Sequence, residues 1–398
     1  MGGQCAQSAC RFGPDGAFSV MQISDVQDAG GIRPRTRELL TAALDREKPD
    51  LAVFSGDQLK GYSRSLWFGD EAQKHALITK TLDELLGLLE ERGIPFTFAF
   101  GNHDHDAPMD PMEQLACYRR SPLCLAAHDP DVPGYANHVI PVEGSKGGDA
   151  LLLYFLDTHN MARFGAYAPL EPDQVEWYRR TRDAAAARNG GACVPSMLFQ
   201  HYPVEELYEL FVQVPRNTPG AFEGWGRRRL RFFKLDEGLV EPGAFAGELP
   251  SCPAVNAGLF DAALEKGEMM GMFFGHDHSN GFCGAVRGVR LGYAPGAGYA
   301  SYGLGRMRGV RVFRFREGDP RAFETYVLTD EQLLGEGRAL DFATRLVDKS
   351  PTSFGTGLLL ARDAAVVITA VAVGRRLIAA GVRAAKRRKL SSTKGKTI

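Results

Sequence analysis

The 398-residue chain has no Cys-x-x-Cys pair, the spacing typical of structural zinc and dithiol redox sites. Its cysteines are odd in number and scattered, which excludes a fully paired disulfide framework and indicates reduced thiols in a cytoplasmic setting. Cys117 and Cys124 are the one pair for which a disulfide stays open. The seven cysteines are Cys5, Cys10, Cys117, Cys124, Cys193, Cys252 and Cys283.

The chain also lacks a strong net charge, and we expect no secretory or myristoylation signal. Its formal net charge of −1 gives no overall field toward nucleic acid or an anionic membrane. The N-terminal MGGQCAQSAC has neither the basic start nor the apolar core of a secretory signal, and Ala6 breaks the myristoylation pattern. We therefore expect a cytoplasmic protein with no nucleic-acid partner.

Short apolar runs are plentiful, and they alternate with helix-like stretches, which is typical of an α/β fold. AFSVMQIS (17–24), LAVFS (51–55) and PFTFAF (95–100) predict strands, and helices are expected over 35–48 and about 70–91. LLLYFLDTHN, SMLFQHYP and MGMFFGHDH repeat the pattern of an apolar strand with a polar end. VRLGYAP and GVRVFRFRE predict closing strands of a sheet.

Polar side chains that can bind a metal ion follow five of these predicted strands. In α/β folds ligands bind at the carboxyl ends of strands, so residues far apart in the chain can converge there. Each motif alone is also explained by a turn or a helix cap. Five in one chain favour a shared site: Asp25 and Gln27 in SDVQ, Asp57 in SGDQ, Asn102 and His103 in GNHD, His201 in FQHYP, and His276 and His278 in GHDH.

The donor types indicate which metals would bind. Carboxylate, amide oxygen and imidazole together suit Mn²⁺, Fe²⁺ or Zn²⁺ and suit Ca²⁺ poorly. Cysteine is missing from the set, which argues against a structural zinc site. The set is too large for one tetrahedral ion, whereas two ions bridged by a shared carboxylate would use it fully.

The motif order D-x-[H/Q], GD, GNH[D/E], H, GHxH resembles the calcineurin-like metallophosphoesterase superfamily. SGDQLKGY, PSCPAVNAGLF, GHDHSNGFCG and LGYAPGAGYASYG are similar to its purple-acid-phosphatase-like branch. The match covers roughly residues 16 to 328. It implies a two-layer mixed β-sandwich flanked by helices, within a catalytic domain over 1–335 that carries an insertion at about 206–255.

The resemblance also implies roles for the residues at the strand ends. His103 would face the substrate phosphate and protonate the leaving oxygen, with Asp104 orienting it. A metal-bound hydroxide would be the nucleophile. The resemblance assigns seven side chains to a dinuclear site: Asp25, Gln27 and His278 to the first metal, Asn102, His201 and His276 to the second, and Asp57 to both.

Two departures from the family pattern bear on metal choice. Gln27 stands where the usual motif has histidine, and an amide oxygen is a weaker, harder donor that leans toward Mn²⁺ or Mg²⁺. The manganese-dependent ADP-ribose/CDP-alcohol diphosphatases of the superfamily also carry D-x-Q. Lys60 stands where purple acid phosphatases have an iron-binding tyrosine, and Tyr62 is out of register. We expect no charge-transfer purple colour.

Several other polar residues are expected to lie outside the site. We expect His105, His128, His138 and His159 to be loop or core histidines. Among them, His159, in DTHN, lies at the end of a predicted strand. The insertion reads as irregular. Its run GWGRRRLRFFKLDE either contacts a second phosphate or a base, or is a solvated cationic loop. The residues concerned are Arg227, Arg228, Arg229 and Arg231, beside Trp225, Phe232 and Phe233.

The C-terminal segment, 336–398, differs in character from the rest. Its longest uncharged run, Ala364 to Gly374, is far shorter than the roughly 20 residues of a spanning helix. Polar residues recur every seven positions, which predicts one polar stripe on an otherwise apolar helix. Such a helix either packs on the domain or a second subunit, or lies on a membrane surface with the basic residues 386–389 as its end. The stripe is Arg362, Thr369, Arg376 and Arg383.

The predicted function is metal-dependent hydrolysis of a phosphorylated small molecule or lipid. Two divalent ions are expected as cofactors, with Mn²⁺ or Fe²⁺ favoured and Zn²⁺ or Mg²⁺ as alternatives. A nucleotide-diphosphate pyrophosphatase is the alternative enzyme. A non-catalytic metal- or phospholipid-binding module is a further alternative, disfavoured because a pure binder has no need of His103. The expected location is cytoplasmic, or peripheral at the inner membrane surface.

Overall fold

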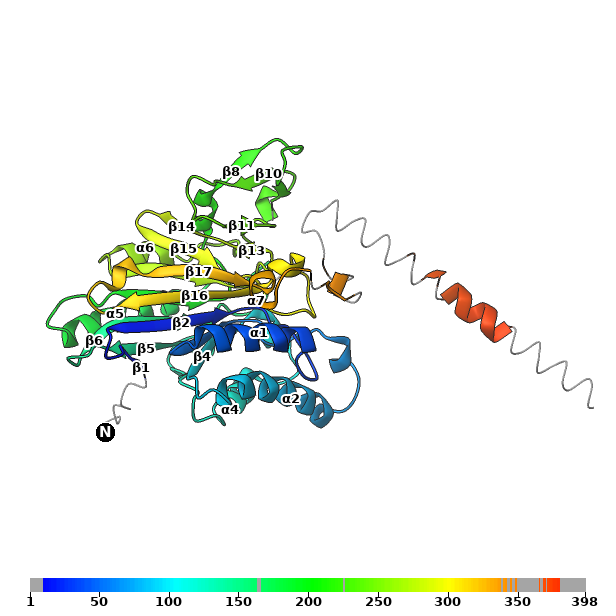
Figure 1. Cartoon of the computed structure of the whole chain (residues 1–398), viewed down its shortest axis with the longest axis horizontal. Helices are drawn as coiled ribbons and strands as arrows, with labels where there is room; N and C mark the ends of the chain where they lie inside the picture. The colour runs from blue at the N-terminus through cyan, green and yellow to red at the C-terminus, as the bar shows by residue number, and fades with distance from the viewer. Residues whose placement is uncertain are drawn as a thin grey trace, which may run out of the picture. The chain divides into compact units, whose positions relative to one another are not determined.

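The computed structural model describes residues 10–162, 166–224, 226–337, 339–341, 344–345, 348, 365, 368–369 and 371–379. Contacts within the chain divide it into two units, Met1–Asp348 and Lys349–Ile398. The first unit contains two large sheets that are flanked by helices (Figure 1). This architecture confirms the predicted fold class.

The larger sheet has seven strands and mixes parallel and antiparallel pairs. Its central strands β6, β7, β12 and β15 are parallel to one another. Their carboxyl ends therefore lie at one edge of the sheet. The strands in spatial order are β1 (Cys10–Arg11), β5 (His138–Glu143), β6 (Asp149–Leu156), β7 (Ser196–Gln200), β12 (Met269–Phe274), β15 (Val289–Tyr293) and β14 (Cys283–Val286).

The second sheet has five strands and contains the first three that the sequence predicts. β2, β3 and β4 are parallel, and β16 pairs antiparallel with both β2 and β17. The observed bounds agree closely with the predicted runs. The spatial order is β17 (Glu324–Thr329), β16 (Gly309–Arg316), β2 (Ala17–Ile23), β3 (Leu51–Ser55) and β4 (Phe96–Ala99).

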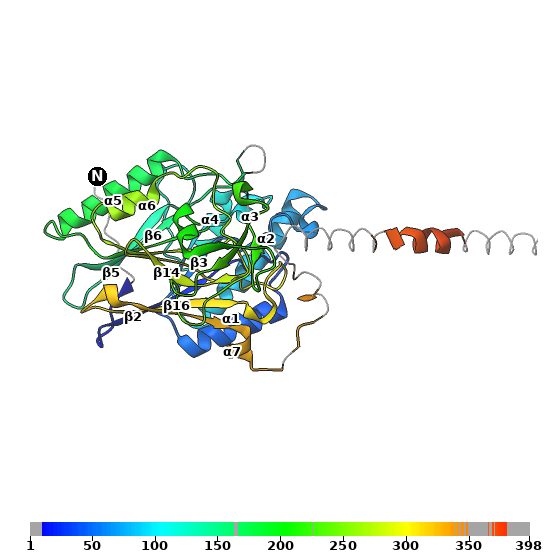
Figure 2. The same cartoon turned by 90° about the horizontal axis from the view of Figure 1, so that it is seen from above.

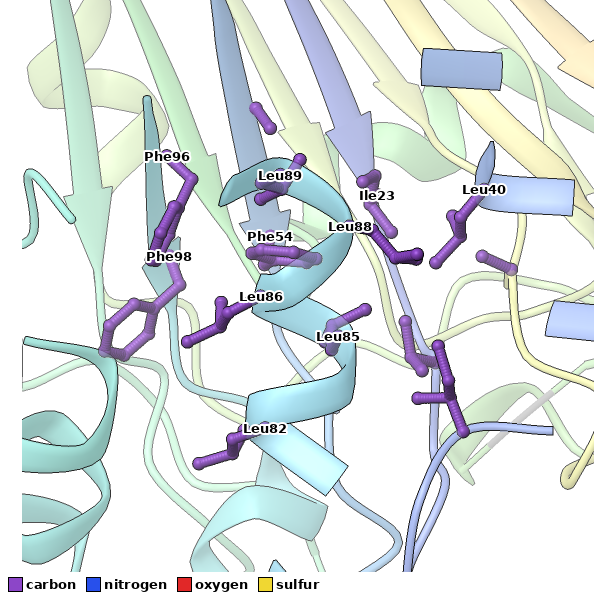
Figure 3. Packing of buried hydrophobic residues seen from close by; sticks show 14 of the residues in the cluster. Ile23, Leu40, Phe54, Leu82, Leu85, Leu86, Leu88, Leu89, Phe96 and Phe98 are labelled. Atoms are coloured by element: carbon purple, nitrogen blue, oxygen red, sulfur yellow. The ribbon is translucent and has the colours of Figure 1, made fainter. Parts of the chain in front are cut away.

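Helices cover the outer faces of the two sheets, as a view from above shows (Figure 2). α1 (Pro34–Glu47) and α2 (Glu71–Glu90) pack on β2, β3 and β4. Figure 3 shows leucines of α2 against Phe54 of β3 and against Phe96 and Phe98 of β4. α5 (Pro172–Arg188) and α6 (Leu259–Leu264) cover the larger sheet.

A third apolar cluster fills the space between the sheets. Val20 and Val53 face it from the five-stranded sheet, and Leu153, Phe199 and Phe273 face it from the seven-stranded sheet; all are fully buried. Because β3, β7 and β12 are buried at every residue, their sequences read as continuous apolar runs rather than alternating ones. The polar residues of these strands are displaced to their ends.

The remaining short helices lie in connecting segments. α3 (Asn102–His105) directly follows β4, α4 (Pro111–Tyr118) begins with the capping box of Asp110 and Glu113, and α7 (Asp330–Leu334) follows β17. Asp330 is buried and accepts hydrogen bonds from the guanidinium groups of Arg35 and Arg306. The ion pair between Asp330 and Arg35 connects α7 to α1.

One expectation is wrong in detail, and one alternative that the sequence left open is decided. The insertion is not irregular: β8 (Phe211–Val214), β10 (Phe232–Leu235) and β9 (Phe222–Glu223) form a small antiparallel sheet, visible beyond β11 (Phe245–Ala246) and β13 (Asn280–Gly281) in Figure 1. Cys117 and Cys124 are not joined, and both are free thiols.

In the second unit the described residues include a helix over 371–379. Its large aliphatic side chains are exposed, with Leu377 at 68% and Ile378 at 70%. None of the helices in the described ranges combines the length and apolar character that a membrane crossing requires. The polar stripe includes Arg362 and Arg383, which lie outside the described residues.

Candidate active site

The predicted ligand residues lie where strands of both large sheets end. β2, β3 and β4 deliver Asp25, Gln27, Asp57 and Asn102 from the five-stranded sheet. β7 and β12 deliver His201, His276 and His278 from the seven-stranded sheet. Hydrogen bonds connect the two sets, among them one from Nδ1 of His201 to the carbonyl of Ser55 (3.0 Å).

Four of these residues have a left-handed backbone. The φ angles of Asp25, Gln27, Asp57 and His276 are 52°, 42°, 56° and 76°. This conformation costs about 1–2 kcal/mol for each residue with a side chain. Backbone hydrogen bonds from Asp25 N to Gly56 O (3.1 Å) and from Gln27 N to Asp57 O (3.0 Å) help to hold it. Such strain gathers at functional sites.

Two glycines allow the segments to approach this closely. A Cβ atom at Gly56, whose φ is +98°, would lie 2.3 Å from Nδ1 of His201. A Cβ atom at Gly275 would lie 2.0 Å from Oγ of Ser24. Either contact would push the β7 or β12 end away from β2 and β3, so both glycines are required for the two sheets to share one site.

A first group of donor atoms surrounds Asp25. Oδ1 of Asp25 lies 3.2 Å from Nε2 of His278, and single atoms of Asp25, Asp57 and His278 all fall within 4.8 Å of one another. The Gln27 amide joins them, with Nε2 2.8 Å from Oδ2 of Asp57 and 3.1 Å from Nε2 of His278. All four side chains are buried.

A second group shares Asp57 with the first. Nε2 of His201 lies 3.3 Å from Oδ2 of Asp57 and 3.2 Å from Oδ1 of Asn102. The His276 ring centroid is 5.1 Å from that of His201. Asp57 therefore lies between the two groups, where a bridging carboxylate would be placed.

The chemistry of these atoms fits divalent cations. In the described part of the chain, Oδ1 of Asp25 is buried and has no hydrogen-bond partner, which is costly unless a cation binds there. His201 and His278 donate Nδ1–H to the carbonyls of Ser55 and Tyr302, so their Nε2 lone pairs face the carboxylates. This arrangement is typical of metal-binding histidines.

Burial and charge set the protonation of the same groups. Burial, with the neighbouring His201, lowers the pKa of His276 well below its ordinary value, so that imidazole is neutral at pH 7. Burial alone would raise the pKa of Asp57, but His201 and His103 hold it below the ordinary range. Burial lowers the pKa of His201, as it does that of His276, yet the Asp57 carboxylate raises the pKa of His201 to about 10. A cation and a proton thus compete for Nε2 of His201.

His103 differs from the ligand residues because its side chain is 27% exposed. Nε2 of His103 lies 3.9 Å from Oδ2 of Asp57, and Nδ1 donates to Oδ2 of Asp106 at 2.8 Å. Asn160 donates to the other oxygen of Asp106 at 2.9 Å. His103 is therefore held from its Nδ1 side, with Nε2 turned toward the site.

The expectation that Asp104 orients His103 is wrong. The Asp104 carboxylate is buried and accepts backbone N–H groups of Asp57 (2.8 Å), Leu59 (2.8 Å) and Gly101 (2.9 Å). It holds the loop after β3 against the start of α3. Sequence reasoning missed Asp106, although its position three residues after His103 placed both on one face of a helical turn.

The sequence also left Tyr62 and Tyr302 outside the site. The Tyr62 hydroxyl donates to Oε1 of Gln27 at 3.0 Å. Tyr302 stacks on His278, with ring centroids 4.2 Å apart, and its hydroxyl donates to the buried Glu248 of the insertion. Burial, with Asp277 beside it, raises the pKa of Glu248 to about 8. The insertion is thus connected to His278 through Tyr302.

The residues predicted to lie outside the ligand set have other partners. His105 bonds Asp157, and His159 bonds Gln174. His128 accepts a backbone N–H, and His138 pairs with Thr97. In the insertion, Arg227 and Arg228 both contact Glu205, and Arg228 covers the Tyr208 ring at 3.6 Å. Trp225 lies outside the described residues.

Comparison with known proteins shows the family of this chain. The family model described as Calcineurin-like phosphoesterase matches residues 18–280. "Probable inactive purple acid phosphatase 14" of Arabidopsis thaliana is 27% identical over 340 residues, which span 76% of each chain. "Phosphatase DCR2" of Saccharomyces cerevisiae is 22% identical over 373 residues, 85% of this chain and 58% of that one.

Two solved structures are similar at lower identity. A dimetal phosphatase from Danio rerio aligns with 13% identity and a TM-score of 0.46, over 78% of this chain and 98% of that one. The purple acid phosphatase PPD1 from yellow lupin aligns with 10% identity and a TM-score of 0.42, over 82% of this chain and 56% of that one.

The fold and the family match together define a metallophosphoesterase, a class of phosphoric ester hydrolases. The chain belongs to the calcineurin-like phosphoesterase family. Proteins of this family act on phosphorylated substrates and use a dinuclear divalent metal site. The carboxylate and imidazole groups at the strand ends of this chain are of the kind that such a site requires.

Proposed function

We propose that the chain hydrolyses phosphate esters with two divalent cations. Asp25, Gln27 and His278 would hold the first, and Asn102, His201 and His276 the second, with Asp57 shared. One observation carries the proposal: Oδ2 of Asp57 lies within 3.3 Å of both Gln27 Nε2 and His201 Nε2, at the junction of the two donor groups. When bound, the ions would neutralise phosphate oxygens and supply a nucleophilic water at neutral pH.

His103 would act on the leaving group. Because Asp106 accepts its Nδ1–H, the charged imidazole presents its second proton at Nε2, on the side of Asp57. A leaving alkoxide is a strong base, and protonating it as the bond breaks removes the charge that opposes the reaction. The 27% exposure of His103 lets this proton reach a substrate that enters from solvent.

The favoured metals follow from the donor set. The amide of Gln27 is a harder, weaker donor than imidazole, so we propose Mn²⁺ or Fe²⁺ as the native ions, with Zn²⁺ and Mg²⁺ as alternatives. The substrate would be a phosphorylated small molecule or lipid. Gln27 supports the pyrophosphatase alternative, whereas two of the four insertion arginines, Arg227 and Arg228, are engaged by Glu205.

The test is hydrolysis by metal-stripped full-length protein, with each metal added back singly. p-Nitrophenyl phosphate, bis-p-nitrophenyl phosphate and ADP-ribose distinguish monoesterase, diesterase and pyrophosphatase. We expect Mn²⁺-dependent turnover that Asp57→Asn and His103→Ala each reduce at least about 100-fold. Tight Mn²⁺ binding without turnover on any substrate would favour the binding-module alternative, and no metal binding would refute the site.

We also propose that the C-terminal segment contacts an anionic membrane surface, which would place the protein peripherally at the inner membrane. Support comes from the exposed Val371, Val373, Leu377 and Ile378. Beyond Asp363 the sequence has nine Lys and Arg residues and no Asp or Glu. Aliphatic side chains beside a cationic run are typical of helices that lie in the headgroup layer.

Liposome sedimentation tests this contact against self-association. The full chain should sediment with vesicles of phosphatidylcholine and phosphatidylserine and not with vesicles of phosphatidylcholine alone. Added salt should weaken the binding to the anionic vesicles. Leu377→Asp combined with Ile378→Asp should abolish sedimentation, whereas Ala372→Asp combined with Ala379→Asp serves as a charge-matched control of lesser effect. Concentration-dependent dimers in the absence of lipid would instead favour self-association.

A further inference from the structure

Tyr62 contacts two residues to which the proposed function assigns different tasks. Its hydroxyl donates to Oε1 of Gln27 at 3.0 Å. Its ring packs on the imidazole of His103, with centroids 4.3 Å apart and planes inclined by 55°. One phenol therefore touches both a residue of the first donor group and the residue placed at the leaving group.

The loop after β3 is built to place Tyr62 between these two partners. Lys60 donates its N–H to the carbonyl of Asp28 (2.9 Å), next to Gln27, and Gly61 donates to the carbonyl of His103 (3.1 Å). A Cβ atom at Gly61 would lie 2.2 Å from that carbonyl, so only glycine permits this approach. Tyr62 follows at once, and both neighbouring segments are fixed.

Glutamine needs such a contact more than histidine does. Its side chain has three rotatable bonds, and ordering it costs about 1.5–2 kcal/mol of conformational entropy. Its amide also presents opposite chemistry at its two ends, because only the carbonyl oxygen can coordinate a cation while the NH₂ group repels one. A ligand of this kind requires a hydrogen bond that fixes both the position and the rotation of the amide.

The Tyr62 hydroxyl can supply that hydrogen bond in either rotation. It donates to Oε1 when Nε2 faces Asp57 and His278, as in this structure. When the amide is turned so that its oxygen faces a cation, the same hydroxyl accepts from Nε2. The Asp57 carboxylate cannot hold the amide in both rotations, because it accepts hydrogen bonds and has no proton to donate.

We propose that Tyr62 is a positioning residue that holds the Gln27 amide through its hydroxyl and the His103 ring through its aromatic face. The inference rests on the proposed two-metal function. Glutamine stands at position 27 where the family motif usually has histidine, and Tyr62 would compensate by holding the more flexible amide in place. The hydroxyl acts on metal binding and the ring acts on turnover, so the two contributions separate experimentally.

The experiment measures Mn²⁺ binding to metal-stripped full-length protein by calorimetry, with bound metal counted by mass spectrometry. Tyr62→Phe should weaken one Mn²⁺ site about 10- to 100-fold and leave the other unchanged, the usual cost of losing a group that orients a ligand. Tyr326→Phe is the matched control, because it removes a hydroxyl bonded to Glu47 elsewhere in the chain. It should leave both affinities unchanged.

A second pair of variants separates positioning from general damage. In a Gln27→His background, Tyr62→Phe should no longer affect Mn²⁺ affinity, since there is no amide to orient. Tyr62→Ala should lower kcat below that of Tyr62→Phe, because only the alanine variant loses the ring on His103. Equal effects of Tyr62→Phe in both backgrounds would overturn the role of the hydroxyl.

Two outcomes separate this inference from the proposed function. A wild-type chain that binds no Mn²⁺ would refute the proposed function and Tyr62 with it. A wild-type chain that binds Mn²⁺ with affinities equal to those of Tyr62→Phe would refute the role of Tyr62 alone.

Discussion

The two aspartates of the GNHDHD segment, Asp104 and Asp106, have different roles although only one residue separates them. Asp104 is fully buried and accepts three backbone N–H groups, whereas Asp106 is partly exposed and faces the His103 ring. Their side chains point in different directions, because residues two apart in a helical turn lie on different faces. Substitution of each should therefore affect a different property of the protein.

Asp106→Ala should lower kcat about 10- to 100-fold with Mn²⁺ affinity unchanged. His103 would lose the acceptor that fixes its ring and its tautomer, while the ligand residues keep their contacts. Steady-state kinetics and calorimetry on the same preparation check this. Asp131→Ala, an exposed aspartate, is the control, and a parallel loss of metal binding in the Asp106 variant would contradict the assignment.

Asp104→Ala should instead lower the free energy of unfolding by about 3 kcal/mol or more. Three buried N–H groups would lose their acceptor, and each unsatisfied group costs about 1–3 kcal/mol. Urea unfolding of metal-stripped protein measures the effect. Stability equal to wild type, with turnover lost, would show that Asp104 acts in catalysis after all.

At the scale of elements, the two sheets are joined by polar contacts as well as by the apolar cluster between them. His138 of β5 pairs through Nε2 with Thr97 of β4 (2.6 Å), donates Nδ1–H to the carbonyl of Ala136 (2.7 Å) and stacks on Phe155 of β6. The imidazole is 4% exposed, and burial lowers its pKa to about 4. The histidine is therefore neutral inside the folded protein.

This histidine should make the sandwich sensitive to acid. Its pKa is lower in the folded than in the unfolded chain, so between pH 6.5 and about 4 only the unfolded chain takes up the proton, and stability falls as the pH falls. The loss attributable to His138 is about 3 kcal/mol over this window. Urea unfolding with a chelator present, at pH 7 and pH 4.5, should show a smaller loss for His138→Gln than for wild type. Equal losses would contradict the assignment.

At the scale of the whole molecule, the proposed metal site lies between the two large sheets. Asp25, Asp57 and Asn102 come from one sheet, and the three histidines come from the other. A cation held by both groups binds the folded chain far better than the unfolded one, because unfolding separates its ligands. Metal binding is therefore expected to stabilise the entire first unit.

Mn²⁺ should raise the midpoint of thermal unfolding. At a free concentration 100 times the dissociation constant, the added stability is about 2.7 kcal/mol for one site. Scanning calorimetry with and without Mn²⁺ measures the shift. Asp57→Asn should lose most of it, and a shift that persists in this variant would place the bound ion elsewhere.

The candidate site could be predicted from the sequence as a set of residues but not as a set of contacts. Asp57 and His276 are recognisable because each ends an apolar run, and the order of such ends along the chain is a local property. Asp106 lies in the same segment, and its spacing of three residues from His103 indicates their contact only once the segment is known to be helical. Tyr62 was set aside for being out of register, and only the path of its loop shows what it touches.

The sequence by itself determined most strands of the two large sheets, the helices α1 and α2, and the polar residues at the strand ends, because periodicity and turn chemistry act over a few residues. Only the tertiary structure decided how these ends combine. The placement of Tyr62 on Gln27, the contact of His201 with Asp57 and the small sheet of the insertion depend on the meeting of backbone segments that are not neighbours in the chain. Those meetings are set by close approaches such as those at Gly56, Gly61 and Gly275, where the absence of one carbon atom lets two chain segments touch.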